Sequence, residues 1–135
     1  MSQANVEAYK RGVGAFNRRD VEAVLEELDP GIEMQLALPA MFGGEATAFR
    51  GHDECRDHLR DLDEAFAEFQ IEIREIRDLG ERLVTIGHLR GRGRVSGAEF
   101  ESPIGYVVDF KNGKAVRYRD YFDADEALEA AGLRE

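Results

Sequence analysis

The C-terminal run from Gly113 to Leu133 constrains the fold of this chain more than any other stretch. It joins a turn, an alternating segment and a helix-forming segment without a linker. Asn112-Gly113 is a typical hairpin turn, and the alternation after it predicts the last strand of a sheet. One strand face carries Val116, Tyr118, Asp120 and Phe122, and the other carries Arg117, Arg119, Tyr121 and Asp123.

Asp120 is the one carboxylate on the apolar face of this predicted strand. Tyr118 and Phe122 on either side would remove it from water, which costs free energy for a charged group. Three interpretations stay open. Asp120 is an unfavourable buried charge, a structural carboxylate held by hydrogen bonds, or an acid/base group whose pKa burial moves toward neutrality.

The residues before this run predict three helices and a first strand. Apolar residues recur with helical spacing in three segments. These are Val6, Tyr9, Val13 and Phe16, then Val21, Val24, Leu25 and Leu28, and later Cys55, Leu59, Leu62 and Phe66. Asp29-Pro30-Gly31 ends the second helix, and alternation from Ile32 to Leu38 predicts a strand. Residues Ala40 to Phe49, which include Phe42, predict a loop over the mouth of a cavity.

The second half of the chain predicts strands. Phe69, Ile71 and Ile73 alternate, and longer strands follow from Leu83 to Val95 and from Ala98 to Phe110 before the last strand. A short helix around Ala124 to Ala131 ends the chain. The order predicts one α+β domain over residues 1–135, in which a curved antiparallel sheet and three N-terminal helices form a cone around a cavity.

Composition limits the partners of this domain. The chain has 135 residues, 43% of them hydrophobic, and a formal net charge of −10. Such a charge repels nucleic acid and anionic membranes, so we expect neither as a partner. The single Cys55 forms no internal disulfide, and neither a signal peptide nor a membrane-spanning run is found, which favours the cytoplasm.

The histidines, the cysteine and the glycine-arginine segment do not predict a cofactor site. His52 and His58 are six residues apart, about 240° around a helix, and His88 lies on a distant strand, so we expect no metal. Cys55 has no evident base partner, which favours core packing over a nucleophile. The glycines and arginines from 87 to 97 alternate without a following helix, so they indicate a solvated or dimer-facing strand rather than a phosphate loop.

Three segments together resemble the nuclear transport factor 2-like superfamily, and within it the SnoaL-like polyketide cyclase group. They are VEAYKRGVGAFNRRDVEAVLEELDPGIE near the N-terminus, FRGHDECRDHL at the third helix, and the ending GKAVRYRDYFDADEALEAAGL. The resemblance implies the cone just described and a small-molecule cavity between sheet and helices. It also implies a homodimer formed through the outer face of the sheet.

The resemblance transfers function only in part. Asp120 matches the last-strand aspartate of the family's epoxide hydrolases, but their arginine and second aspartate would fall at Gly87 and Leu89. The base of the family's ketosteroid isomerases falls at Gln35, which takes up no proton at useful pH. Tyr106 matches the position of their acid donor. The family's polyketide cyclases use a cavity aspartate as acid/base, a role that Asp120 fits.

The expected ligand-binding residues follow from these placements. Ile104 and Tyr106 lie on the strand face that should meet Tyr118, Asp120 and Phe122. The two arguments disagree on the first strand, since alternation sends Met34 and Leu36 to the interior and the family alignment sends Glu33 and Gln35 there. We follow the alignment and expect Glu33 and Gln35 in the cavity, with Glu33 close enough to pair with Asp120.

The function expected from this set is the binding of a small, largely apolar ligand that carries a carbonyl or hydroxyl group. Asp120 would serve as the acid/base of an isomerase or cyclase without a cofactor. Tyr106 and Tyr118 would donate hydrogen bonds to the ligand, or else fill the core. The alternative is a non-catalytic binding or interaction module on the same fold.

Overall fold

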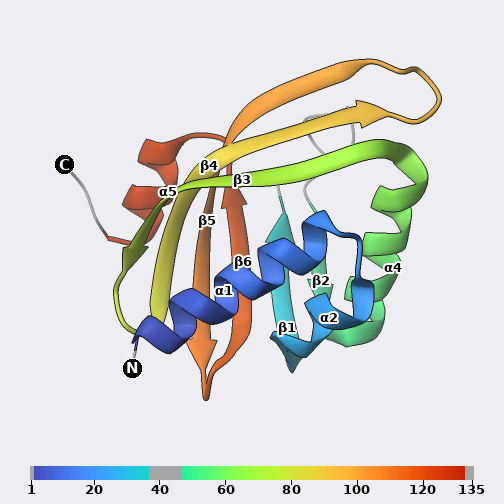
Figure 1. Cartoon of the computed structure of the whole chain (residues 1–135). Coiled ribbons are helices and arrows are strands. Elements are labelled where there is room, and N and C mark those ends of the chain that lie inside the picture. The colour runs from blue at the N-terminus through green and yellow to red at the C-terminus, as the bar shows by residue number, and fades with distance from the viewer. Residues whose placement is uncertain (1, 37–46, 133–135) are drawn as a thin grey trace.

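The computed structural model describes residues 2–36 and 47–132 (Figure 1). Its helices are α1 (Ser2–Asn17), α2 (Val21–Glu26), α4 (Gly51–Ala65) and α5 (Ala124–Ala130). Its strands are β1 (Leu28–Leu36), β2 (Thr47–Arg50), β3 (Phe66–Asp78), β4 (Arg82–Gly93), β5 (Glu99–Lys111) and β6 (Lys114–Tyr121). The predicted α+β class and the order of three helices before the long strands are confirmed.

The six strands form one sheet in the order β2-β1-β6-β5-β4-β3. Neighbouring strands are antiparallel except β1 and β6, which run parallel with Met34 opposite Tyr118. The sheet is therefore mixed, whereas an antiparallel sheet was predicted. Alternation within each segment indicates a strand but not its direction relative to a partner far along the chain.

Two local predictions differ from the structure near β1 and β2. β1 begins at Leu28 and runs through Pro30 and Gly31, which were predicted only to end the second helix. Its pairing with β6 shifts register between Leu28 and Glu33. Proline donates no ladder hydrogen bond, so this irregular stretch accommodates it. Thr47–Arg50, predicted partly as loop, pairs with β1 as the edge strand β2.

The sheet curves strongly because its longest strands carry bulges. The register of β3 on β4 shifts between Phe66 and Glu68 and again between Ile73 and Glu75, and that of β5 on β6 shifts between Asp109 and Phe110. Each extra residue bends its strand and increases the twist. In Figure 1, α1, α2 and α4 lie on one side of the curved sheet and α5 lies on the other. The three N-terminal helices thus cover the concave face.

Burial separates the two faces of the sheet. The main core lies under the helices and contains Tyr9, Val13 and Ala15 from α1 with Leu83, Val108 and Phe110 from the sheet. A second cluster of Phe69, Leu89 and Ile104 continues the same face. On the outer face, Ala127 and Leu128 of α5 pack against Val84 and Val107. None of the helices in the described ranges is long and apolar enough to cross a membrane.

Candidate functional site

The concave face of the sheet and the helices enclose an interior chamber of about 90 Å³. Its walls come from α1, α2, β1, α4, β3, β5 and β6. Most of the lining side chains are apolar, such as Val13, Leu36 and Ile71. The lining residues with polar or ionisable groups are Tyr9, Cys55, His58, Tyr106, Tyr118 and Asp120. The chamber is an apolar site with a few convergent polar groups, as small-molecule sites usually are.

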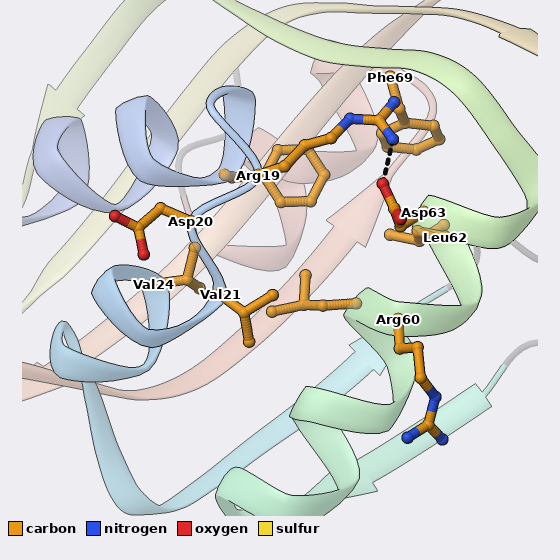
Figure 2. Close-up of a pocket in the computed structure, with 10 residues that line it drawn as sticks. Arg19, Asp20, Val21, Val24, Arg60, Leu62, Asp63 and Phe69 are labelled. Carbon is orange, nitrogen blue, oxygen red and sulfur yellow. Dashed lines mark hydrogen bonds and ion pairs between the residues drawn. The ribbon is translucent and has the colours of Figure 1, made fainter.

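A second cavity of about 240 Å³, called the mouth below, adjoins this chamber (Figure 2). The two cavities share the lining residues Phe16, Val24, Leu59, Leu62 and Phe69. Charged side chains surround the outer part of the mouth, and an ion pair between Arg19 and Asp63 joins the α1–α2 connection to α4. Arg19 Nη2 also donates to the carbonyl oxygen of Ala67 at 2.9 Å. A ligand would pass from this polar rim into an apolar interior.

Asp120 lies in the wall of the chamber that β6 forms. Only 5% of its surface is exposed, and it is opposite Tyr106 in the pairing of β5 with β6. Tyr118, two residues before it, lines the chamber from the same strand face. The alternation in the sequence thus puts a carboxylate among aromatic rings, on the concave side of the sheet.

Three tyrosines stand around this carboxylate. The Tyr118 ring packs edge-on against Tyr106 with centroids 6.0 Å apart, and it stacks on Tyr9 at 6.4 Å. Burial raises the pKa of Tyr106 well above its usual value, and the charge of Asp120 raises that pKa further. Burial likewise raises the pKa of Tyr118 and of Tyr9. All three phenols therefore keep their protons near neutral pH, and a protonated phenol can donate a hydrogen bond.

The tyrosine from α1 has a partner in the sheet. The hydroxyl oxygens of Tyr9 and Thr85 lie 2.8 Å apart, and Thr85 is 2% exposed. Tyr9 itself is buried in the main core. This hydrogen bond fixes α1 over β4 and holds the Tyr9 ring against Tyr118. Tyr9 was predicted only as a core residue of the first helix, since its helical spacing does not reveal which sheet residues it meets.

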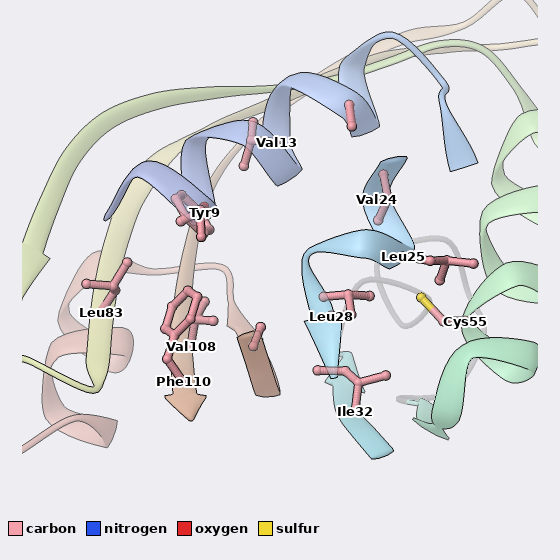
Figure 3. Close-up of a cluster of buried hydrophobic side chains, with 13 residues drawn as sticks. Tyr9, Val13, Val24, Leu25, Leu28, Ile32, Cys55, Leu83, Val108 and Phe110 are labelled. Atoms are coloured by element: carbon pink, nitrogen blue, oxygen red, sulfur yellow. The ribbon is translucent and has the colours of Figure 1, made fainter. Parts of the chain in front are cut away.

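Cys55 faces the chamber from α4, and its sulfur points toward Leu25 and Leu28 (Figure 3). Its Sγ lies 4.0 Å from the sulfur of Met34. Burial raises the pKa of the Cys55 thiol to about 11. A protonated, buried thiol is a poor nucleophile, in agreement with the packing role predicted from the sequence.

His58 is a chamber residue that sequence reasoning missed. It lies on α4 three residues after Cys55 and four before Leu62, and all three line the chamber. Burial lowers the pKa of His58 from 6.5 to about 4, against a smaller opposing influence of Asp61. The imidazole is thus neutral near pH 7. The available signal was the helical spacing of His58 with Cys55 and Leu62, which puts the three on one face of the helix. From the sequence, His58 was considered only as a metal ligand.

Glu33 and Gln35 do not reach the chamber, which corrects the prediction made from the family alignment. Both are exposed, and Glu33 Oε1 accepts a hydrogen bond from Arg50 Nη2 at 2.9 Å on neighbouring β2. Met34 and Leu36 line the chamber instead. Successive side chains of a strand point to opposite faces, so the alternation argument gave the right orientation. Glu33 is therefore not a partner for Asp120.

Two other predicted ligand-binding residues, Ile104 and Phe122, are not among the residues that line the chamber. Ile104 is buried in the second cluster, where Phe122 packs against it. Phe69 of that cluster lines the chamber, whereas Ile104 and Phe122 do not. Ile104 and Phe122 therefore support the chamber wall from behind. Phe42 lies outside the described residues.

Neither of the positions expected for the hydrolase arginine and second aspartate suits a charged side chain. A Cβ atom added to Gly87 would lie 1.9 Å from the carbonyl oxygen of Glu72 on β3. Leu89 is fully buried in the second cluster. Within the described residues, no group of three or more His, Cys, Asp and Glu side chains is arranged to hold a metal ion.

Curved sheet, covering helices and interior chamber together define a cone-shaped α+β domain of the nuclear transport factor 2-like fold. Residues 6–118 match the family described as SnoaL-like domain. The chain belongs to this family.

Solved structures with the same fold cover nearly the whole chain. A nuclear transport factor 2-like protein of unknown function from Burkholderia pseudomallei is 29% identical, with a TM-score of 0.80 over 93% of this chain and 95% of that one. A similar protein from Burkholderia xenovorans is 26% identical, with a TM-score of 0.74 over 97% of each chain. TerC, co-crystallised with polyporic acid, is 22% identical, with a TM-score of 0.78 over 96% and 97%. No curated protein matches the sequence.

Proposed function

We propose that this protein binds a small, largely apolar ligand bearing a carbonyl or hydroxyl group, and that Asp120 acts on it as the general acid/base of an isomerase or cyclase. One observation carries the proposal. A carboxylate that is 5% exposed lines an interior chamber together with Tyr9, Tyr106 and Tyr118. Buried acids next to hydrogen-bond donors in a cavity are typical of acid/base sites.

The chemistry follows from the two kinds of group. The Asp120 carboxylate takes a proton from the carbon next to a carbonyl, and the electron pair of the broken C–H bond moves to the carbonyl oxygen. Protonated tyrosines stabilise that oxygen by donating hydrogen bonds to it. Return of the proton to another carbon gives an isomer. Attack of the enolate carbon on a second carbonyl instead closes a ring, and the alkoxide oxygen formed there takes the proton back from Asp120.

The ligand class follows from charge and lining. The net charge of −10 and the buried carboxylate disfavour an anionic ligand. The apolar walls favour a mainly hydrocarbon body, and the tyrosine donors favour an oxygen acceptor on it. The interior of about 90 Å³ and its mouth of about 240 Å³ suit a small molecule. TerC, which has the same fold, was co-crystallised with polyporic acid, which supports a small-molecule role for the fold.

A non-catalytic binding module is the second candidate. It is favoured by Gly87, where the sheet leaves no room for a side chain, and by Leu89, which is buried among apolar residues. It is also favoured by Gln35, which lies outside the chamber. In this case Asp120 and the tyrosines would only hold the ligand. The two candidates differ in whether a bound ketone exchanges its α-protons.

The test uses cyclohexanone in D₂O, with α-proton loss followed by ¹H NMR and binding followed by amide chemical shifts. We expect the wild-type protein to catalyse the exchange and Asp120→Asn to lose about 10²-fold or more of the rate. Asp125→Asn, an exposed aspartate in the first turn of α5, is the matched control and should exchange like wild type. Binding without exchange would favour the second candidate, and equal rates for wild type and Asp120→Asn would contradict the acid/base role.

We also propose that two copies associate through the outer face of the sheet. Beyond α5, the outer face of β3, β4 and β5 carries charges of both signs, with ion pairs Arg92–Glu68 at 3.2 Å and His88–Glu101 at 2.9 Å. A face of mixed charge can pair with itself across a two-fold axis. Light scattering should give twice the mass of one chain, and a single-chain mass at micromolar concentration would contradict the dimer.

A further inference from the structure

We propose that His58, in addition to Asp120, contacts the ligand. His58 donates a hydrogen bond to the ligand's oxygen atom, while Asp120 removes and returns the proton on the ligand's carbon. The inference deepens the proposed function and rests on it. It assigns a role to a residue of α4, on the helix side of the chamber. The acid/base proposal concerns Asp120, on the sheet side.

His58 is aimed at the chamber by the helix that carries it. Cys55 and Leu62, one turn before and after it, line the same chamber, so this stripe of α4 faces inward. Charged residues such as Asp57 and Asp61 lie on the exposed surface of the helix. His58 is thus the polar member of an otherwise apolar inner stripe. Asp120, on β6, lines the chamber from the sheet, so a ligand in the chamber lies between helix and sheet.

The ring of His58 is held by packing and left open for hydrogen bonding. The Phe49 ring from β2 lies 4.5 Å from it, centroid to centroid, at an interplanar angle of 38°. This contact restricts how the imidazole rotates. Among the described residues, no hydrogen bond to either ring nitrogen is found, in contrast to His52, whose Nε2 lies 2.9 Å from the Leu28 carbonyl oxygen, and to His88, which pairs with Glu101. The described part of the chain therefore leaves the hydrogen-bonding capacity of His58 to a ligand.

The charge state of His58 suits this role. Burial keeps its pKa near 4, so the imidazole is neutral and carries one N–H donor at physiological pH. A neutral imidazole polarises a carbonyl without adding a buried positive charge, and a carboxylate base on the other side of the substrate complements it. When Asp120 takes the α-proton, negative charge grows on the ligand oxygen, and the N–H of His58 stabilises it there. The proton returns from Asp120 to carbon, so the step needs no other reactant.

The contact is tested by titrating full-length protein, uniformly labelled with ¹⁵N, with cyclohexanone. We expect the ring signals of His58 to shift with saturation, while those of His52 and His88, which do not line the chamber, stay in place. A His58 signal that does not move while amide signals of Tyr106 and Asp120 do would overturn the contact. Absence of any shift would count against both the contact and the proposed function.

Variants of His58 then test its part in the chemistry by α-proton exchange. His58→Phe keeps a ring but removes the N–H, and we expect it to lose about 10²-fold of the exchange rate, as the loss of one oxyanion donor does. His58→Gln keeps a donor and should recover part of that loss. His52→Gln is the control and should match wild type.

The pattern of rates separates the two proposals. If His58→Phe exchanges as fast as wild type while Asp120→Asn is slow, the role of His58 fails and the proposed function stands. If Asp120→Asn exchanges as fast as wild type while cyclohexanone still shifts His58, the acid/base function fails and the contact stands. Circular dichroism of each variant shows whether a lost rate reflects unfolding.

Discussion

His58 and Cys55 show how burial sets chemistry at the scale of single residues. Both lie on one turn of α4 and both face the chamber. Burial makes the charged form of each side chain less favourable, so it lowers the pKa of the histidine and raises that of the cysteine. The same apolar surroundings therefore keep both groups neutral, and each neutral state has a measurable consequence.

The neutral state of His58 predicts a loss of stability in acid. Its pKa is lower in the folded chain than in the unfolded one, so the unfolded chain binds more protons between pH 6.5 and pH 4. The contribution of this residue is fully present above pH 6.5 and is lost as pH falls toward 4, by on the order of 2–3 kcal/mol. Urea unfolding at several pH values measures it.

His58→Phe should remove this part of the pH dependence, because phenylalanine takes up no proton. His88→Gln is the matched control, since the exposed Glu101 pairs with His88 outside the chamber. An equal pH slope for wild type and His58→Phe would show that His58 is not buried as described.

The thiol of Cys55 should react slowly in the folded protein. It is 1% exposed, and with a pKa of about 11 it contains little thiolate at pH 8. We expect a disulfide reagent to react roughly 10²-fold more slowly with the native chain than with the chain in guanidinium, since the thiolate is the reactive form. Since this is the one cysteine of the sequence, the signal is unambiguous. Fast native labelling would mean that α4 opens readily.

At the scale of elements, the side chain of Asn17 joins α1 to the edge strand of the sheet by hydrogen bonds. Asn17 Nδ2 donates to the carbonyl oxygen of Ile71 at 2.9 Å, and Asn17 Oδ1 accepts from the Ile71 N–H at 2.9 Å. β3 is the last strand of the sheet, so these backbone groups have no further strand to pair with. The amide of Asn17 supplies both partners, as a neighbouring strand would.

Asn17→Ala should therefore lower the free energy of unfolding by about 2 kcal/mol, the net value of two partly buried hydrogen bonds. Gln3→Ala is the matched control on the same helix, because its exposed hydrogen bond to Glu7 should contribute less than about 0.5 kcal/mol. Urea denaturation measures both variants. Equal stabilities would show that the Asn17 contact does not hold α1 on the sheet.

At the scale of the whole molecule, the mouth and the chamber form one path. Val21 of α2 lines the mouth but not the chamber, which makes it a position that affects access alone. The rim above it holds the Arg19–Asp63 ion pair. We expect a ligand to reach Asp120 and His58 through this opening between the helices.

Val21→Trp should narrow the mouth and lower the rate of cyclohexanone exchange at low ketone concentration roughly tenfold, because binding then needs a side-chain rearrangement. Glu26→Trp, at an exposed position of the same helix, is the control and should leave the rate unchanged. If both variants exchange like wild type, the ligand reaches the chamber by another route.

Local patterns in the sequence predicted the elements and the concave face of the sheet. Alternation placed Tyr118 and Asp120 on one face, and helical spacing placed Val13 and Cys55 in the core, because these periods are properties of the backbone itself. The parallel pairing of β1 with β6 and the strand β2 were not predicted. Their direction and existence depend on segments that meet only after the chain has folded.

The sequence by itself determined that a carboxylate, Asp120, would lie among aromatic side chains on the last strand, since that follows from alternation alone. Only the tertiary structure decided which side chains lie across the chamber from Asp120. It brought Tyr9 and His58 to the chamber from two helices. The physical reason is that residues from distant segments meet through packing and burial, which depend on the whole fold, whereas the face of a strand is set by neighbours along the chain.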